Sequence, residues 1–195
     1  MNQEIMQETD CSRLVIKSVG PASIQFLKLK CNNFQEAFDY IKGLPYKRNQ
    51  QRHFPLAVIV EGCGTCSTKH AILKMLAEEN SWNQISLFIG FFNMSKYFNK
   101  KISNILSTHK LIYFPEAHCY LKINGQILDC TFTNETNSNF EIIHEQEISL
   151  LEAGEHKAIF HKMYLENWLK GSPEINYSLD EIWKIRELCI ASLAN

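Results

Sequence analysis

Residues 117–132 read AHCYLKINGQILDCTF, and this stretch decides the fold. Asn124 and Gly125 form the dipeptide that best suits a two-residue type I′ turn, because both central residues of that turn need a positive φ. The segments on either side, 117–123 and 126–132, are predicted to pair as antiparallel strands. The sequence therefore predicts a β-hairpin whose register is set by its turn.

This register places His118 and Asp129 on the same face of the hairpin. Counting outward from the turn, His118 faces Thr131 and Tyr120 faces Asp129. His118 and Asp129 are then diagonal neighbours, about 7–8 Å apart before side-chain reach is counted, which allows a hydrogen bond between them. An Asp-oriented His is half of a nucleophilic triad, because the carboxylate fixes the tautomer and stabilises the imidazolium. The opposite face is expected to be core and carries Cys119, Leu121, Leu128 and Cys130.

A nucleophile to complete the triad is found in residues 61–71, which read EGCGTCSTKHA. The helical spacing of apolar residues that follows ends near Asn80, so Cys66 is predicted to lie at a helix N-terminus. The partial positive charge and free N–H groups there stabilise a thiolate, and a neighbouring imidazolium does so again. The backbone N–H of Cys66 would also point toward a developing oxyanion. Candidates for a further oxyanion donor or substrate contact are Tyr46, Gln50, Gln51 and Tyr120.

These residues resemble the transglutaminase-like superfamily, in which a papain-like core presents Cys, His and Asp in this chain order. The resemblance covers residues 61–132. It implies Cys66 as the nucleophile, His118 as base and acid, and Asp129 as the residue that orients His118. Members of that superfamily include cross-linking enzymes, deamidases, thiol proteases, peptide N-glycanases and inactive proteins, so the fold and the triad transfer better than the substrate.

Two further sequence features bear on this resemblance. The superfamily often places an aromatic side chain upstream of the cysteine as an oxyanion donor, and here Tyr40 or Tyr46 would have to substitute for it. The whole chain, with PEAHCY at 115–120 and WKIR at 183–186, also resembles a small bacterial family of uncharacterised proteins.

The rest of the chain predicts a single α+β domain over residues 1–195, with residues 1–10 loosely held. Further strands are predicted at 13–19, 85–92 and 140–148, an apolar run at 56–60, and helices at 33–43, 66–80, 100–108, 155–170 and 179–193. The Cys66 helix is expected to pack on the antiparallel sheet, and the C-terminal helices are expected to cover the remainder. Their inward residues are predicted to be Phe160, Met163, Tyr164 and Trp168, then Ile182, Ile185, Cys189 and Ile190.

Composition narrows the class of protein. The chain has 195 residues, of which 45% are hydrophobic and 21% charged, as in ordinary globular domains. A net charge of -1 gives no general attraction to nucleic acid or anionic membranes. The apolar windows at 56–60 and 86–92 are shorter than the ~20 residues of a membrane helix, and the N-terminus lacks a signal-peptide pattern. With seven cysteines read as reduced thiols, we expect a soluble cytoplasmic protein.

The functional hypothesis is a cysteine-dependent acyl transferase or hydrolase directed at amides, of the transglutaminase, deamidase or protease type. Its substrate would be a protein, a peptide or a small amide, and it needs no cofactor. Cys66 would attack the carbonyl, His118 would protonate the leaving group, and water or an amine would resolve the acyl-enzyme.

Three alternatives remain open on the sequence. Cys63 and Cys66 form a C-x-x-C pair, which is also typical of redox dithiols. A zinc site could be built from Cys63, Cys66, His70 and His118. In a catalytically inactive binding module, Cys66 would be a small buried hydrophobe, His118 a satisfied core histidine and Asp129 a surface acid. The remaining histidines are expected to be partly exposed: His53, His109, His144, His156 and His161. Charged residues that either contact substrate or form salt bridges are Arg48, Arg52 and Glu61.

Overall fold

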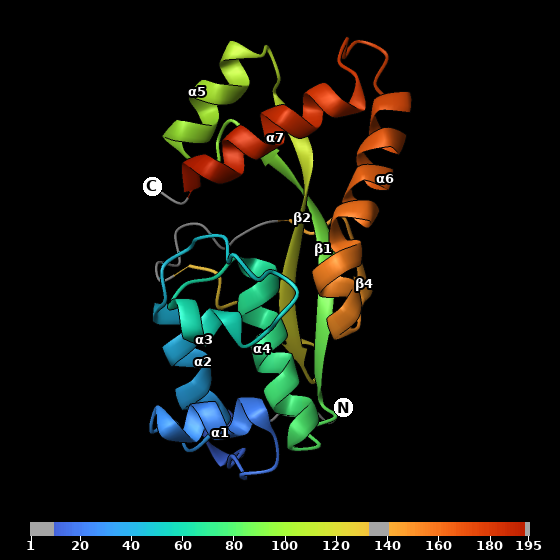
Figure 1. The fold of residues 1–195 in the computed structure, drawn as a ribbon. Coiled ribbons are helices and arrows are strands. Elements are labelled where there is room, and N and C mark those ends of the chain that lie inside the picture. The colour runs from blue at the N-terminus through green and yellow to red at the C-terminus, as the bar shows by residue number, and fades with distance from the viewer. Residues whose placement is uncertain (1–9, 133–140, 194–195) are drawn as a thin grey trace, which may run out of the picture.

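An antiparallel sheet with the strand order β3-β2-β1-β4 forms the centre of the fold. In this computed structural model, which describes residues 10–132 and 141–193, the strands are β1 (Ile85–Ser95), β2 (Tyr113–Ile123), β3 (Gln126–Leu128) and β4 (His144–Glu147). β1 and β2 are the long central pair (Figure 1). The predicted α+β class is confirmed.

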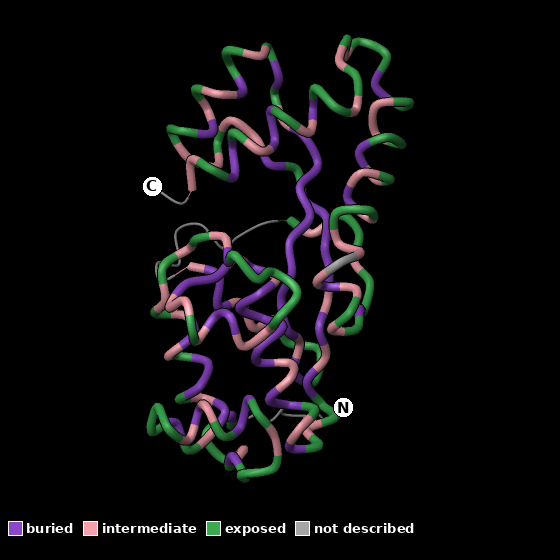
Figure 2. Tube along the Cα trace, viewed as in Figure 1, coloured by how far each residue is buried: buried purple, intermediate pink, exposed green. Residues whose placement is uncertain are grey.

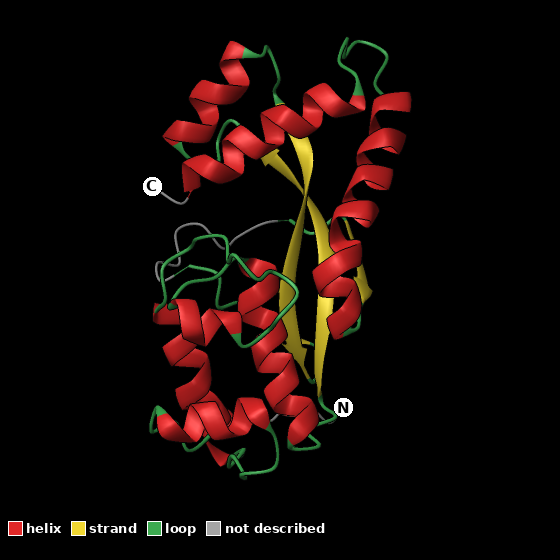
Figure 3. Cartoon of the chain, in the orientation of Figure 1, coloured by secondary structure: helices red, strands yellow, loops and turns green. Residues whose placement is uncertain are grey.

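Helices pack around this central pair at both of its ends. They are η1 (Cys11–Arg13), α1 (Pro21–Lys28), α2 (Phe34–Gly43), α3 (Ala57–Glu61), α4 (Cys66–Glu79), α5 (Lys100–Thr108), η3 (Glu152–His156), α6 (Lys157–Lys170) and α7 (Leu179–Leu193). α4 packs along β1 and β2 with α1, α2 and α3 beyond it, whereas α5 and α7 lie at the other end of the strands (Figures 1 and 3). None of the described helices combines the length and the apolar character needed to cross a membrane.

Buried side chains form two clusters, one at each end of the central strands. The larger cluster joins α1, α2 and α4 to the sheet through residues such as Phe34, Leu76 and Leu87. The smaller cluster joins α5 and α7 to the far ends of β1 and β2 through Phe114 and Ile185. Figure 2 shows burial continuing along β1 and β2 between the two clusters.

The hairpin has the predicted turn and register. Asn124 and Gly125 both have positive φ, at 49° and 83°, as a type I′ turn requires. Leu121 pairs with Leu128, in the register counted from the turn. The second strand is shorter than predicted and ends at Leu128 instead of continuing to 132. The chain turns away there because the Asp129 carboxylate accepts a hydrogen bond from the Thr131 N–H instead of leaving it to the ladder.

Four of the predicted helices are confirmed, and two segments in the N-terminal half of the chain differ from prediction. α2, α4, α5 and α7 begin and end within a residue of their predicted bounds. The strand predicted at 13–19 is wrong: Val15 forms only an isolated bridge to Asn33, and helix α1 follows. Pro21 in its first turn is the signal for this helix. The apolar run at 56–60 contributes to the short helix α3.

The predicted C-terminal elements also need correction. β4 spans only His144–Glu147 of the predicted 140–148, whose first residue lies outside the described residues. The helix predicted at 155–170 is α6, which begins at Lys157 after the π-helical turn η3. Its buried residues are His161 and Leu165, whereas Met163 is 57% exposed and is not an inward residue.

Candidate active site

Cys66 is the first residue of α4 and lines a pocket between the two ends of the fold. Thr65 precedes it in an extended conformation and donates its N–H to Thr68 Oγ1 at 2.9 Å, which starts the helix at this point. The first N–H groups of a helix have no intrahelical acceptor, so the Cys66 N–H is available beside its own sulfur. Cys66 itself is 6% exposed.

His118 and Asp129 are brought together by the hairpin. His118 Nε2 lies 2.7 Å from Asp129 Oδ2, while Asp129 Oδ1 accepts the Thr131 N–H at 2.8 Å. Each oxygen of the Asp129 carboxylate therefore has a hydrogen-bond partner, and one of these hydrogen bonds occupies Nε2 of the imidazole. Nδ1 is the nitrogen left to interact with Cys66.

Cys66 interacts with both His118 and Cys119, which are neighbours on β2. Neighbouring residues of a strand point to opposite faces, so a single thiol reaches both only from the edge of the strand. That edge is open because β3 ends at Leu128, opposite Leu121. Cys119 was predicted to be a core residue without function. It is fully buried, and its interaction with Cys66 raises the pKa of its own thiol well above the usual range.

The electrostatics favour a thiolate–imidazolium pair. A hydrogen bond from Cys119, the Lys157 ammonium and His118 hold the pKa of the Cys66 thiol well below its usual range, although burial opposes this. Burial would lower the pKa of His118, but Asp129 and Cys66 outweigh it and raise this pKa to about 10. These interactions favour a Cys66 thiolate beside a protonated His118.

His70 is a second buried histidine beside the pair. Its Nδ1 lies 2.7 Å from the Cys66 carbonyl and its Nε2 accepts the Cys130 N–H at 2.9 Å, so Nδ1 carries the proton. Burial lowers the pKa of His70 and keeps it neutral. Both nitrogens are engaged, which leaves none for a metal. In residues 10–132 and 141–193, no three His, Cys, Asp or Glu side chains are grouped to hold a metal ion. The zinc alternative built on Cys63, Cys66, His70 and His118 is therefore not supported.

Lys69, the neighbour of His70, is completely buried and was not singled out in the sequence. Its ammonium donates to four backbone carbonyls: Lys42 at 3.4 Å, Leu44 at 2.6 Å, Cys130 at 3.3 Å and Thr131 at 3.0 Å. These carbonyls belong to the end of α2 and to the segment directly after Asp129. Lys69 therefore links the segment directly after Asp129 to α4, the helix that begins at Cys66.

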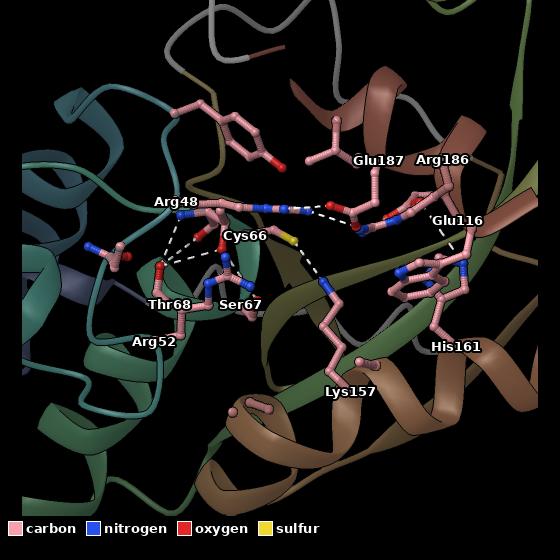
Figure 4. A pocket seen from close by; sticks show the side chains of 18 residues that line it. Arg48, Arg52, Cys66, Ser67, Thr68, Glu116, Lys157, His161, Arg186 and Glu187 are labelled. Atoms are coloured by element: carbon pink, nitrogen blue, oxygen red, sulfur yellow. Dashed lines mark hydrogen bonds and ion pairs between the residues drawn. The ribbon is translucent and has the colours of Figure 1, made fainter. Parts of the chain in front are cut away.

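The pocket around Cys66 is rich in paired charges (Figure 4). Arg186 from α7 donates to the buried Glu116 carboxylate through two nitrogens, at 2.9 and 2.6 Å. Arg48 donates to Glu187 at 2.5 and 2.9 Å. His161 was expected to be partly exposed, which is wrong: it is 1% exposed, and its Nε2 lies 2.8 Å from the Pro115 carbonyl oxygen.

Lys157 is the residue of this pocket that sequence reasoning missed. It begins α6, and its Nζ lies 3.1 Å from Cys66 Sγ. In the sequence it is one lysine of an amphipathic helix, and no local motif distinguishes it.

The candidate donors have different positions relative to Cys66. Tyr46 lines the pocket together with Cys66. Gln50 and Gln51 are exposed and donate their backbone N–H groups to Glu61. Of the others, Tyr120 donates its hydroxyl to Glu145 on β4, and Tyr40 packs partly buried against the larger core cluster.

Comparisons with known proteins do not identify the family of this chain. This chain matches no family model, no curated protein and no solved structure. The geometry of Cys66, His118 and Asp129 is therefore the main indication of function.

We expect iodoacetamide to alkylate Cys66 before the other cysteines at about pH 6.5. All seven thiols are free and buried, so exposure does not separate them. Ionisation distinguishes Cys66 from the other thiols, because the pKa of Cys66 is lowered. In contrast, burial raises the pKa of Cys11, Cys31, Cys130 and Cys189. Peptide mapping after brief exposure to the reagent measures this order.

The pH dependence of the same reaction provides the control. Alkylation of an ordinary thiol, with a pKa of about 8.5, slows about tenfold for each pH unit below that value. Alkylation of Cys66 should stay nearly constant over that range. A tenfold decline per unit at Cys66, or faster labelling of Cys11 or Cys189, would contradict a stabilised thiolate.

Proposed function

We propose that this protein is a cysteine-dependent acyl transferase or hydrolase with a transglutaminase-like core. The observation that carries the proposal is the hydrogen bond of 2.7 Å between His118 and Asp129 at the strand edge that meets Cys66. A helix that begins at a cysteine and packs on an antiparallel sheet bearing the histidine also agrees with the superfamily resemblance. Cys66, His118 and Asp129 are the proposed catalytic residues.

The chemistry follows from the protonation states of the pair. Cys66 Sγ attacks the carbonyl carbon of an amide, and the electron pair of the C=O bond moves onto the oxygen beside the Cys66 N–H. His118 then gives its Nδ1 proton to the leaving amine as the C–N bond breaks. Water or a second amine, losing a proton to His118, attacks the acyl-enzyme and releases the product. Asp129 holds the imidazole in position and stabilises its charge throughout.

A simple active ester tests this proposal. We expect p-nitrophenyl acetate to place a single acetyl group on Cys66, visible by intact mass and peptide mapping. The Cys63→Ser variant should be acetylated like the wild type, and Cys66→Ser should not be acetylated. Acetylation at Cys63, or equal loss of labelling in both variants, would favour a dithiol or metal role for the C-x-x-C pair.

A further inference from the structure

Lys157 brings a second positively charged group, after His118, to the Cys66 sulfur from a distant part of the chain. Figure 4 shows its side chain rising from α6 into the pocket and ending at the sulfur, 3.1 Å away. Among the described residues, the Cys66 sulfur is the atom that accepts a hydrogen bond from the Lys157 ammonium. Lys157 is thus in direct contact with the proposed nucleophilic atom.

The acidic residues of the pocket form their hydrogen bonds with arginines, although the Glu116 carboxylate also attracts the Lys157 ammonium. Both carboxylates of the lining, Glu116 and Glu187, accept close hydrogen bonds from arginines. Arg186 bonds to Glu116 and also to Glu187, at 2.7 Å. The short contact of the Lys157 ammonium is with the sulfur instead.

We propose that Lys157 is a catalytic residue that donates a hydrogen bond to the oxyanion formed when Cys66 attacks a carbonyl. This inference rests on the acyl chemistry proposed above. As the S–C bond forms, the electron pair of the C=O bond moves onto oxygen, so the negative charge moves from the sulfur to an atom two bonds away. When the C–N bond breaks, that pair returns to the carbonyl and the amine leaves with the His118 proton.

An ammonium suits this transfer of charge. It carries three donor hydrogens on a flexible four-carbon stem, so Nζ can hold the thiolate at rest and follow the charge to oxygen. With the Cys66 N–H it supplies the pair of preorganised donors that oxyanion sites use. Lys157 thereby fills the role for which the sequence offered Tyr46, Gln50, Gln51 and Tyr120 as candidates.

The test compares two reactions of Cys66 in a Lys157→Met variant. Alkylation by iodoacetamide displaces iodide and forms no oxyanion, whereas acylation by p-nitrophenyl acetate forms one. Each rate is measured across pH up to the plateau at which the thiol is fully ionised. We expect the alkylation profile to move to higher pH with a plateau close to wild type. The plateau rate of acylation should fall about 100-fold.

Two further variants complete the experiment. Lys162→Met is the matched control, since Lys162 lies on the same helix over the Trp183 ring, 5.0 Å from its centroid, and both its rates should equal those of the wild type. Lys157→Gln keeps a side-chain donor without the charge and covers the case in which the Met variant does not fold. In whichever of the two Lys157 variants is folded, a larger loss in the acylation rate than in the alkylation rate supports the proposal.

The outcomes that overturn the inference are distinct from those that overturn the proposed function. Equal plateau losses for alkylation and acylation would mean that Lys157 acts on the thiolate alone. A wild-type protein that is alkylated at Cys66 but never acylated there would overturn both the acyl chemistry and the role of Lys157.

Discussion

Replacing Asp129 with Asn is expected to slow acylation of Cys66 by up to ~10⁴-fold while the hairpin stays folded. Asn is nearly isosteric with Asp, so packing at the strand edge is preserved. The negative charge is lost, however, and with it the main interaction that keeps His118 protonated. The thiolate of Cys66 loses its imidazolium partner, and the leaving group loses its proton donor.

The hydrogen bonds around Asp129 make this substitution especially damaging here. Oδ1 accepts the Thr131 N–H and Oδ2 faces His118 Nε2, so both oxygens act as acceptors. An amide that keeps its oxygen toward Thr131 turns its NH₂ toward Nε2 and forces the proton of a neutral His118 onto Nδ1. That tautomer cannot accept a proton on the side of Cys66. The opposite amide orientation places two donors against each other at Thr131.

The measurement is the rate of p-nitrophenyl acetate acylation, with thermal unfolding recorded for the same variant. Glu145→Gln is the matched control. It makes the same carboxylate-to-amide change at a residue that accepts hydrogen bonds from Tyr120 and Lys122. It should leave acylation within a few-fold of wild type. An Asp129→Asn protein that melts normally and reacts as fast as wild type would show that no functional triad is assembled.

The parts of the fold that local chemistry determines could be predicted from the sequence. The Asn124-Gly125 turn sets the register as far as Leu128, and His118 and Asp129 meet at 2.7 Å although the strand pairing predicted for them is not formed. α7 was predicted to the residue because its apolar spacing is regular. The strand predicted at 13–19 is wrong because the short apolar run Leu14-Val15-Ile16 resembles a strand, whereas only Val15 makes a bridge.

The charged residues around the site could not be predicted, because contacts between distant segments bury them. Cys66 and Lys157 are 91 residues apart, and Lys69 and Cys130 are 61 apart. In the sequence each of these lysines looks like an ordinary exposed residue of an amphipathic helix. The burial of His161 could not be predicted for the same reason. Lys157 and His161 reach their partners because α6 packs beside the central strands, and Lys69 reaches its own at the end of α2 and in the segment after Asp129.

Replacing Lys69 with Met is expected to lower the free energy of unfolding by about 3 kcal/mol or more. Met matches the apolar stem and removes only the ammonium. The carbonyls of Cys130, at 3.3 Å, and Thr131, at 3.0 Å, would then be buried without that donor. A buried polar group left unsatisfied costs about 1–3 kcal/mol, and two or more are affected here. Denaturant unfolding followed by tryptophan fluorescence measures the loss.

Lys74→Met on the same helix is the control for this effect. Lys74 donates to a single backbone carbonyl, Ile85, at 2.9 Å, so its loss should cost only about 1 kcal/mol. Because Lys69 binds the carbonyls of the two residues after Asp129, Lys69→Met should also slow alkylation of Cys66 under conditions where it is still folded, and Lys74→Met should not. Equal destabilisation by the two substitutions, or full Cys66 reactivity in a folded Lys69→Met protein, would mean that this buried ammonium does not hold Asp129 in place.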